Sequence, residues 1–216
     1  MDSSVPEKVG SKADARREMI VEAAYRVLVR DGYKAASILA IAKEAKASNE
    51  TLYRWYGNKQ GLFASLVERN AQAARALLDV ALASDSDPLA VLEQLGPLLL
   101  LLVTSERAVA LNRAAAGDVY DTGTLGAALA KGGRESLVPL IAKLLTQADV
   151  QGLLRIDEPG EAADTYISLL LGDVQIRRAT GVLDGLSATE IEKRASKAMH
   201  LLKRLFAPVA PGDLQT

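Results

Sequence analysis

Apolar residues in the first third of the chain recur at the spacing of amphipathic helices. The first stripe follows the i, i+3, i+4, i+7, i+8 pattern of a helix with one buried face, and consists of Ile20, Ala23, Ala24, Val27 and Leu28. Gly32 can take the left-handed conformation that ends such a helix. Ser37 suits the N-cap of a short second helix, whose stripe is Ile38, Ile41, Ala42 and Ala45.

The pattern then predicts a third, short helix and a long fourth one. Ser48 can cap a helix that starts at Asn49 and carries Leu52, Trp55 and Tyr56 on one side. Gly57 stops this helix, and Asn58 can cap the next. The fourth helix carries the apolar stripe Phe63, Leu66, Val67, Leu77, Leu78, Ala81 and Leu82.

The remaining chain also reads as helix, because Ala, Leu, Glu, Lys and Arg dominate and no run of alternating β-branched residues occurs. Polar and glycine-containing breaks delimit helices near 88–104, 106–118, 124–150, 160–181 and 188–206. Pro97 and Pro139 should kink their helices or mark extra boundaries. The sequence predicts an all-α fold of about nine helices.

We expect two domains and two disordered ends. Residues 1–58 form an N-terminal three-helix unit with a disordered tail at 1–12, and residues 59–207 form a larger helical body. Residues 208–216 are expected to be a disordered tail.

Composition narrows the class of protein. The 216 residues include no cysteine, which excludes disulfides, thiolate metal sites and cysteine nucleophiles. The polar start does not resemble a secretory signal, and the longest apolar run, 97–103, is far short of the roughly 20 residues of a membrane span. We expect a cytoplasmic chain with no membrane partner.

Charge is distributed unevenly along the chain. Residues 1–70 carry 12 Lys/Arg and 9 Asp/Glu, a net charge of +3, whereas residues 71–216 carry 14 and 18, a net charge of −4. A mildly basic front on an acidic body is weakly indicative of a polyanion partner.

Two short helices joined by about three residues form a helix-turn-helix, which places its second helix in the major groove of DNA. In the helix from Asn49 to Tyr56, we expect Leu52, Trp55 and Tyr56 to face the core. The opposite edge carries Asn49, Glu50, Thr51, Tyr53 and Arg54. On pattern alone, Tyr53 is equally an ordinary surface residue or a phosphate contact.

The segment "GYKAASILAIAKEAKASNETLYRWYGNKQGLFASLV" resembles the signature of TetR-family transcriptional regulators. In that family a Thr/Ser-x-x-x-Ile-Ala helix and a short turn precede a Leu-Tyr-x-aromatic-aromatic-x-x-Lys run. The matching residues, spread over about 50 positions, are Ser37, Ile41, Ala42, Leu52, Tyr53, Trp55, Tyr56, Lys59, Leu62 and Phe63.

The resemblance implies DNA-contacting roles for particular residues. Tyr53 and Lys59 would touch the DNA backbone, with Lys59 at the start of the fourth helix, where free N–H groups also favour phosphate. Base-reading or groove-lining positions fall on Asn49, Glu50 and Thr51. Arg54 would pair with a phosphate or with Glu50, and Ser37 joins the expected DNA contacts. A solvated cation is the alternative for Lys59.

Four positions depart from the family pattern. Lys46 occupies the turn position usually held by Gly, and Ala47 stands where Val is common. Glu50 replaces a small residue, and Gly61 replaces the Glu or Gln that would complete a capping box from Asn58. These differences concern the operator sequence and the start of the fourth helix.

For the body, the segments 102–123 and 152–173 resemble the C-terminal domain of AefR-like members. The family resemblance implies a homodimer formed through the helices near 160–181 and 188–206, although burial inside a monomer would also explain the apolar run "YISLLLGDVQI". It also implies a pocket for a small, mainly apolar effector, with candidate lining residues Leu99, Val103, Asn112, Tyr120, Leu144 and Tyr166.

The sequence therefore favours a repressor that binds a palindromic double-stranded DNA operator as a homodimer and is released by an effector. The alternative is a helical small-molecule-binding module without functional DNA binding. We expect no enzymatic activity and no cofactor, because no nucleophile–base pair or phosphate-binding loop is evident. No metal site is expected, since the lone His200 has no second His or Cys to join it.

Overall fold

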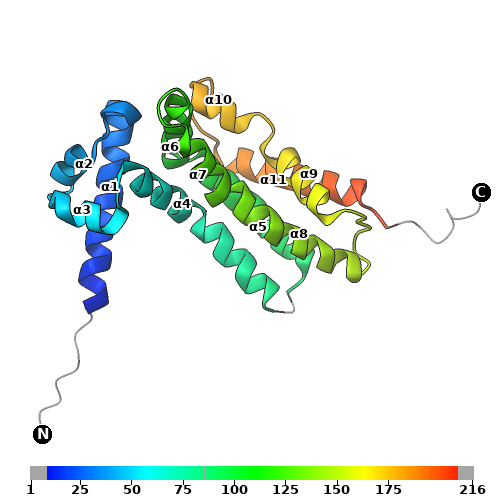
Figure 1. Cartoon of the computed structure of the whole chain (residues 1–216). Coiled ribbons are helices and arrows are strands. Elements are labelled where there is room, and N and C mark those ends of the chain that lie inside the picture. The colour runs from blue at the N-terminus through cyan, green and yellow to red at the C-terminus, as the bar shows by residue number, and fades with distance from the viewer. Residues whose placement is uncertain (1–8, 85, 209–216) are drawn as a thin grey trace, which may run out of the picture.

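The computed structural model describes residues 9–84 and 86–208, and the regular secondary structure of this part of the chain is entirely helical. Figure 1 shows α1, α2 and α3 gathered at one end, α4 leading away from them, and α5–α11 forming the larger body. The helices are α1 (Val9–Ala35), α2 (Ile38–Glu44), α3 (Asn49–Tyr56), α4 (Lys59–Leu82), α5 (Pro88–Thr104), α6 (Glu106–Asp118), α7 (Thr124–Gly132), α8 (Arg134–Val150), α9 (Pro159–Leu171), α10 (Val174–Thr180) and α11 (Ala188–Leu205). The predicted all-α class is confirmed.

The first helix differs from expectation at both ends. It begins at Val9, so residues 9–12 of the expected disordered tail are helical, while residues 1–8 and 209–216 lie outside the described residues. At the other end, Gly32 interrupts α1 with φ 74° and ψ 171°. The predicted break is confirmed, but this ψ lies far from that of a left-handed helical cap.

Two expected helices are each divided in the structure. The predicted 124–150 helix breaks at Gly133, and the predicted 160–181 helix breaks at Gly172, whose φ is +49°. Pro139 lies inside α8 and Pro97 lies inside α5, and neither marks a helix boundary. A Cβ on Gly132 would come within 2.7 Å of Val67 Cγ1, so the absence of a side chain lets the α7–α8 junction approach α4 closely.

The described helices share two apolar cores. One core joins α1, α2, α3 and the start of α4, and the other fills the body between α4, α5, α8, α9 and α11. Helix α6 contributes Ala110, Leu111, Ala114 and Ala115 to the N-terminal core, so it belongs to both parts of the molecule. No single described helix is long and apolar enough to cross a membrane; only α5 and α6 taken together, across a 57° bend, meet the length and composition expected of a span.

The turn between α2 and α3 contains a conformational strain. Lys46 has φ +50°, and it is the only residue other than glycine with a positive φ in the described chain. Such a conformation costs about 1–2 kcal/mol in an L-residue other than glycine. The Arg16 guanidinium donates to the Lys46 carbonyl at 2.9 Å, which helps hold the turn. The turn thus keeps a glycine-like geometry without glycine.

The first prediction follows from this strain. Lys46→Gly should raise the free energy of unfolding by about 1 kcal/mol, since glycine takes a positive φ at little cost. Lys143→Gly is the matched control: Lys143 is exposed in the interior of helix α8, so the same change should lower stability by about 1 kcal/mol. Urea titration of both variants measures the two effects, and a loss of stability in Lys46→Gly would contradict the strain.

The start of α4 explains why Gly61 stands where a capping-box side chain is expected. Asn58 Oδ1 accepts from the Gly61 N–H at 2.8 Å, as an N-cap should. A Cβ at Gly61 would lie 2.1 Å from the Tyr56 carbonyl oxygen, which is a backbone atom. The last turn of α3 and the first turn of α4 therefore pack too closely for any side chain at this position.

We predict that Gly61→Ala lowers the free energy of unfolding by about 2 kcal/mol, because the added methyl group forces the α3–α4 junction apart. Gly126 lies in α7 with nothing within 4 Å of an added Cβ. Gly126→Ala should therefore raise stability by about 0.5–1 kcal/mol. Thermal unfolding of the pair followed by circular dichroism tests this, and equal effects of the two changes would refute it.

Candidate functional site

Helix α3 is held in place by a few inward contacts. Ser48 Oγ accepts from the Thr51 N–H at 3.2 Å and caps the helix, and Gly57, with φ +75°, ends it. Leu52 is fully buried beneath the helix. Trp55 and Tyr56 are half-buried against the N-terminal core, where the Arg17 guanidinium lies 5.3 Å from the Trp55 ring. The expected inward edge is thus confirmed, with one residue completely enclosed.

The opposite edge of α3 is open to solvent. Asn49, Glu50 and Arg54 are exposed, and Tyr53 is 55% exposed. Arg54 could have paired with Glu50, but none of the ion pairs between described residues joins them. The edge therefore presents an amide, a carboxylate, a phenol and a guanidinium to an approaching molecule.

Two predicted hydroxyl contacts, Ser37 and Thr51, form hydrogen bonds at the starts of helices, and Ser37 is an N-cap. Ser37 is exposed and its Oγ accepts from the Ala40 N–H at 3.1 Å, which leaves its own O–H free to donate. Thr51 is only half-exposed, and its Oγ1 lies 2.8 Å from Ser48 Oγ. Ser37 is therefore better placed than Thr51 to bind an anion.

Lys59 is the predicted residue whose surroundings differ most from expectation. Its ammonium donates to the Tyr33 carbonyl and lies 3.7 Å from the centre of the Tyr33 ring. Burial lowers the pKa of Lys59, and the nearby carboxylates of Asp121 and Asp118 partly offset this. One of its three donors is engaged within the chain, so any outside contact must use the remaining two.

The structure adds three lysines that the sequence did not predict as DNA contacts. Lys43 and Lys46 lie on the same helix-turn-helix as Arg54, Lys34 lies at the end of the preceding helix α1, and all four are exposed. None of these four forms an ion pair with another described residue. The net positive charge of residues 1–70 indicated that such cations exist in this part of the chain. A count of charges does not distinguish these unpaired lysines from Arg26 and Arg30, which form ion pairs with Glu44.

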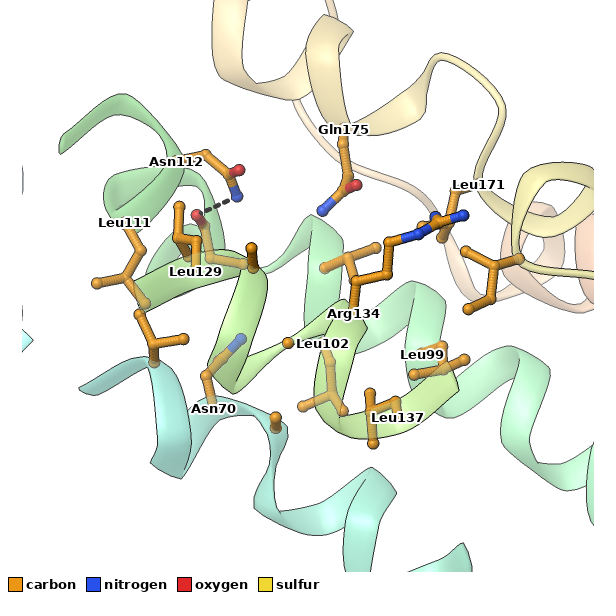
Figure 2. Close-up of a pocket in the computed structure, with 17 residues that line it drawn as sticks. Asn70, Leu99, Leu102, Leu111, Asn112, Leu129, Arg134, Leu137, Leu171 and Gln175 are labelled. Atoms are coloured by element: carbon orange, nitrogen blue, oxygen red, sulfur yellow. Dashed lines mark hydrogen bonds between the residues drawn. The ribbon is translucent and has the colours of Figure 1, made fainter. Parts of the chain in front are cut away.

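The body contains a largely apolar cavity of about 290 Å³. It lies among α4–α10, and Figure 2 shows leucine side chains from several of these helices around the hollow. Its apolar wall includes Val67, Leu99, Leu102, Leu111, Leu129 and Leu137. Such a space suits a small apolar ligand body.

Three of the six predicted lining residues border this cavity, namely Leu99, Val103 and Asn112. The other three do not. Leu144 is fully buried in the body core, and the buried Tyr166 hydroxyl donates to the Leu92 carbonyl at 2.7 Å. Tyr120 follows α6 and is 99% exposed. Helical periodicity identified buried faces but could not separate side chains facing a cavity from those filling the core.

Most of the lining residues that the sequence did not predict are apolar, but three of them are polar. Asn70, Arg134 and Gln175 border the cavity together with Asn112. Arg134 was not predicted because the sequence indicated one unbroken helix over 124–150. In the structure the helix breaks at Gly133, and Arg134 is the first residue of α8. Among the described residues, no group of three or more His, Asp or Glu side chains is arranged to hold a metal ion.

Comparisons with known proteins agree with both parts of the molecule. The family model for bacterial regulatory proteins of the tetR family matches residues 20–66, which include α2, α3 and the start of α4. The model for the AefR-like transcriptional repressor C-terminal domain matches residues 90–208, more than half of the chain.

Individual proteins are similar over different extents. The chain is 39% identical over 75 residues to the HTH-type transcriptional repressor SCO4008 of Streptomyces coelicolor, a match that spans about a third of either protein (35% and 36%). A TetR-family regulator from Mesorhizobium loti has a similar fold, with TM-score 0.75, 21% identity and coverage of 90% of this chain and 98% of that one.

Thermus thermophilus FadR, solved in complex with lauroyl-CoA, also shares the fold, with TM-score 0.59, 22% identity and coverage of 91% and 98%. The two family-model matches follow one another along the chain, and the first covers a helix-turn-helix whose outward edge is open. The chain belongs to the TetR family, with a C-terminal domain of the AefR-like repressor type.

Proposed function

We propose that this protein is a repressor that binds a palindromic double-stranded DNA operator as a homodimer and is released by a small, mainly apolar effector. The observation that carries the proposal is the open polar edge of α3, opposite the buried Leu52. We place its action in the cytoplasm, where bacterial DNA lies.

At this edge, we assign base contacts and phosphate contacts to different residues. Asn49 and Glu50 lie in the first turn of α3, the part of a recognition helix that reaches base edges in the major groove. Asn can bond adenine through two hydrogen bonds, and Glu can accept from cytosine. The hydroxyls of Ser37 and Tyr53 and the cations Arg54 and Lys59 would hold phosphates, which fix register without reading sequence.

A homodimer follows from the size of the recognition helix. The eight residues of α3 cover too few base pairs for useful specificity, whereas two copies about one DNA turn apart read a palindrome. We propose that α9, α10 and α11 form the interface. In support, Ile176 of α10 is an apolar side chain that is 62% exposed in the single chain.

Helices α10 and α6 connect the cavity to the DNA-binding helices, so they can transmit a displacement caused by a bound effector. Gln175 of α10 borders the cavity, and Arg178, one turn later, is only 6% exposed. Arg178 donates to the Thr104 carbonyl at 3.0 Å and to Glu106 Oε1 at 2.6 Å, where α5 meets α6. In return, Arg113 of α6 donates to the Ala179 carbonyl at 2.8 Å. We propose that an effector displaces α10, and with it α6.

Because α6 packs into the N-terminal core, a shift of α6 would tilt the helix-turn-helix and change the spacing of the two recognition helices. The effector would then favour the dimers whose spacing no longer matches the operator. The similar FadR was solved with lauroyl-CoA, which supports an apolar ligand in this fold.

A small-molecule-binding module without DNA binding is the second candidate. The engagement of Lys59 with the Tyr33 carbonyl favours it, since a predicted phosphate contact is partly occupied. Salt dependence separates the two candidates, because phosphate contacts weaken steeply as salt rises.

For the DNA-binding proposal, we predict distinct effects of three substitutions. Tyr53→Phe and Arg54→Gln should weaken binding by a similar factor on all sequences, and Arg54→Gln should reduce the slope of log affinity against log salt by about 1 per subunit. Asn49→Ala should instead cost about 1–3 kcal/mol on the operator and change sequence preference. Fluorescence anisotropy, with an inverted repeat from the DNA beside the gene and a scrambled duplex, measures these effects.

Lys143→Gln provides the control, because Lys143 is exposed on α8, outside the proposed dimer interface, and its substitution should leave DNA affinity unchanged. Salt-independent affinity, or unchanged affinity in all three variants, would favour the module without DNA binding.

For the dimer, we predict that Ile176→Glu shifts the protein toward monomers, since a buried carboxylate without a partner is costly at an interface. Light scattering after gel filtration gives the mass directly. Val80→Glu is the matched control, because Val80 is 69% exposed but lies on α4, outside the proposed interface. A wild-type protein that runs as a monomer at micromolar concentration would refute the interface.

A further inference from the structure

The cavity in the body has a charged residue at only one point. Of the described residues that line it, Arg134 alone carries a charge, and the other polar side chains are the amides of Asn70, Asn112 and Gln175. The Arg134 side chain is 51% exposed, so the guanidinium lies where the cavity meets solvent. Figure 2 shows Arg134 reaching from α8 past Leu171, with Gln175 descending from α10.

The partner of Arg134 is held weakly. Its Nη2 lies 2.7 Å from Asp164 Oδ1 of α9, and the Asp164 side chain is 52% exposed. An ion pair between two such exposed groups stabilises the fold by only about 0–1 kcal/mol. A guanidinium has five donors in a planar fork, so a second carboxylate can share or replace this contact at little cost to the protein.

The amides near the cavity can add neutral hydrogen bonds. The Asn112 Nδ2 group is occupied, since it donates to the Ala108 carbonyl at 2.8 Å, while its oxygen remains able to accept. The side chains of Asn70 and Gln175 form no hydrogen bond with another described residue. An amide has both donors and acceptors, so these three side chains can bind either a donor or an acceptor of the ligand. Only Arg134 distinguishes ligands by their charge.

The apolar wall sets the size of the ligand body. A cavity of about 150 Å³ lined by apolar side chains takes up benzene. The cavity here is about 290 Å³, close to twice that volume, so it accommodates an apolar body of about ten to twelve carbon atoms. A positive ligand would meet Arg134 and find no carboxylate among the lining residues.

We propose that the effector is an amphipathic monocarboxylate of this size, whose carboxylate binds Arg134 at the mouth in competition with Asp164 while its apolar body fills the cavity. Since the cavity is the effector site of the function proposed above, this names the chemical class of the effector. Binding in the absence of DNA tests it, so its failure would leave the DNA-binding proposal standing.

The experiment compares acids with matched neutral amides in calorimetric titrations of the full-length protein at pH 7. The probes are decanoate and 2-naphthoate against decanamide and 2-naphthamide. We expect at least one acid to bind at least tenfold more tightly than its amide. Arg134→Gln should remove this preference, whereas Arg155→Gln, an exposed arginine that does not line the cavity, should retain it.

Asp164→Asn provides a second test of the competition for Arg134, and it leaves all the side chains that line the cavity in place. Removal of the competing carboxylate should tighten acid binding by about threefold or more and leave amide binding unchanged. Equal affinity for acids and amides, no binding of any probe, or acid binding unaffected by both substitutions would overturn the proposal.

Discussion

The enclosure of Leu52 is the contact on which the DNA-binding interpretation depends. An isolated helix of eight residues is unstable in water, so α3 exists only because its neighbours hold it. Leu52 provides the fully buried anchor, Ser48 satisfies a free N–H at the start, and Gly57 allows the chain to turn immediately into α4. These inward contacts fix the rotation of α3 and hence the outward direction of Asn49 and Tyr53.

Helix α6 links this small anchor to the rest of the molecule. Its alanines pack into the N-terminal core, while Arg178 of α10 binds Glu106 at its start and its own Arg113 donates to the Ala179 carbonyl of α10. Buried arginines are costly to desolvate, and Arg178 is retained where backbone carbonyls and Glu106 satisfy it. A contact network of this kind has little freedom to deform gradually, so it suits a shift between two arrangements better than a continuous adjustment.

The sequence predicted most of the helix boundaries because caps and apolar periodicity are local signals, as at Ser37, Ser48 and Asn58. It missed the breaks at Gly133 and Gly172, since glycine within a helical pattern does not reveal whether its backbone leaves the helix. The strained Lys46 was visible only as a departure from a family pattern. In the cavity, Leu144 and Tyr166 were misplaced because both belong to buried faces, and only three-dimensional packing decides which buried face borders empty space.

Amide hydrogen exchange, with and without duplex DNA from the region beside the gene, tests the central claim most directly, because it maps contact along the whole chain at once. If α3 docks in the major groove, protection on adding DNA should concentrate in residues 37–60, with α7, α8 and α11 unchanged beyond any effect of dimerisation. Unaltered exchange in α3 together with DNA-dependent protection of the body would contradict the account.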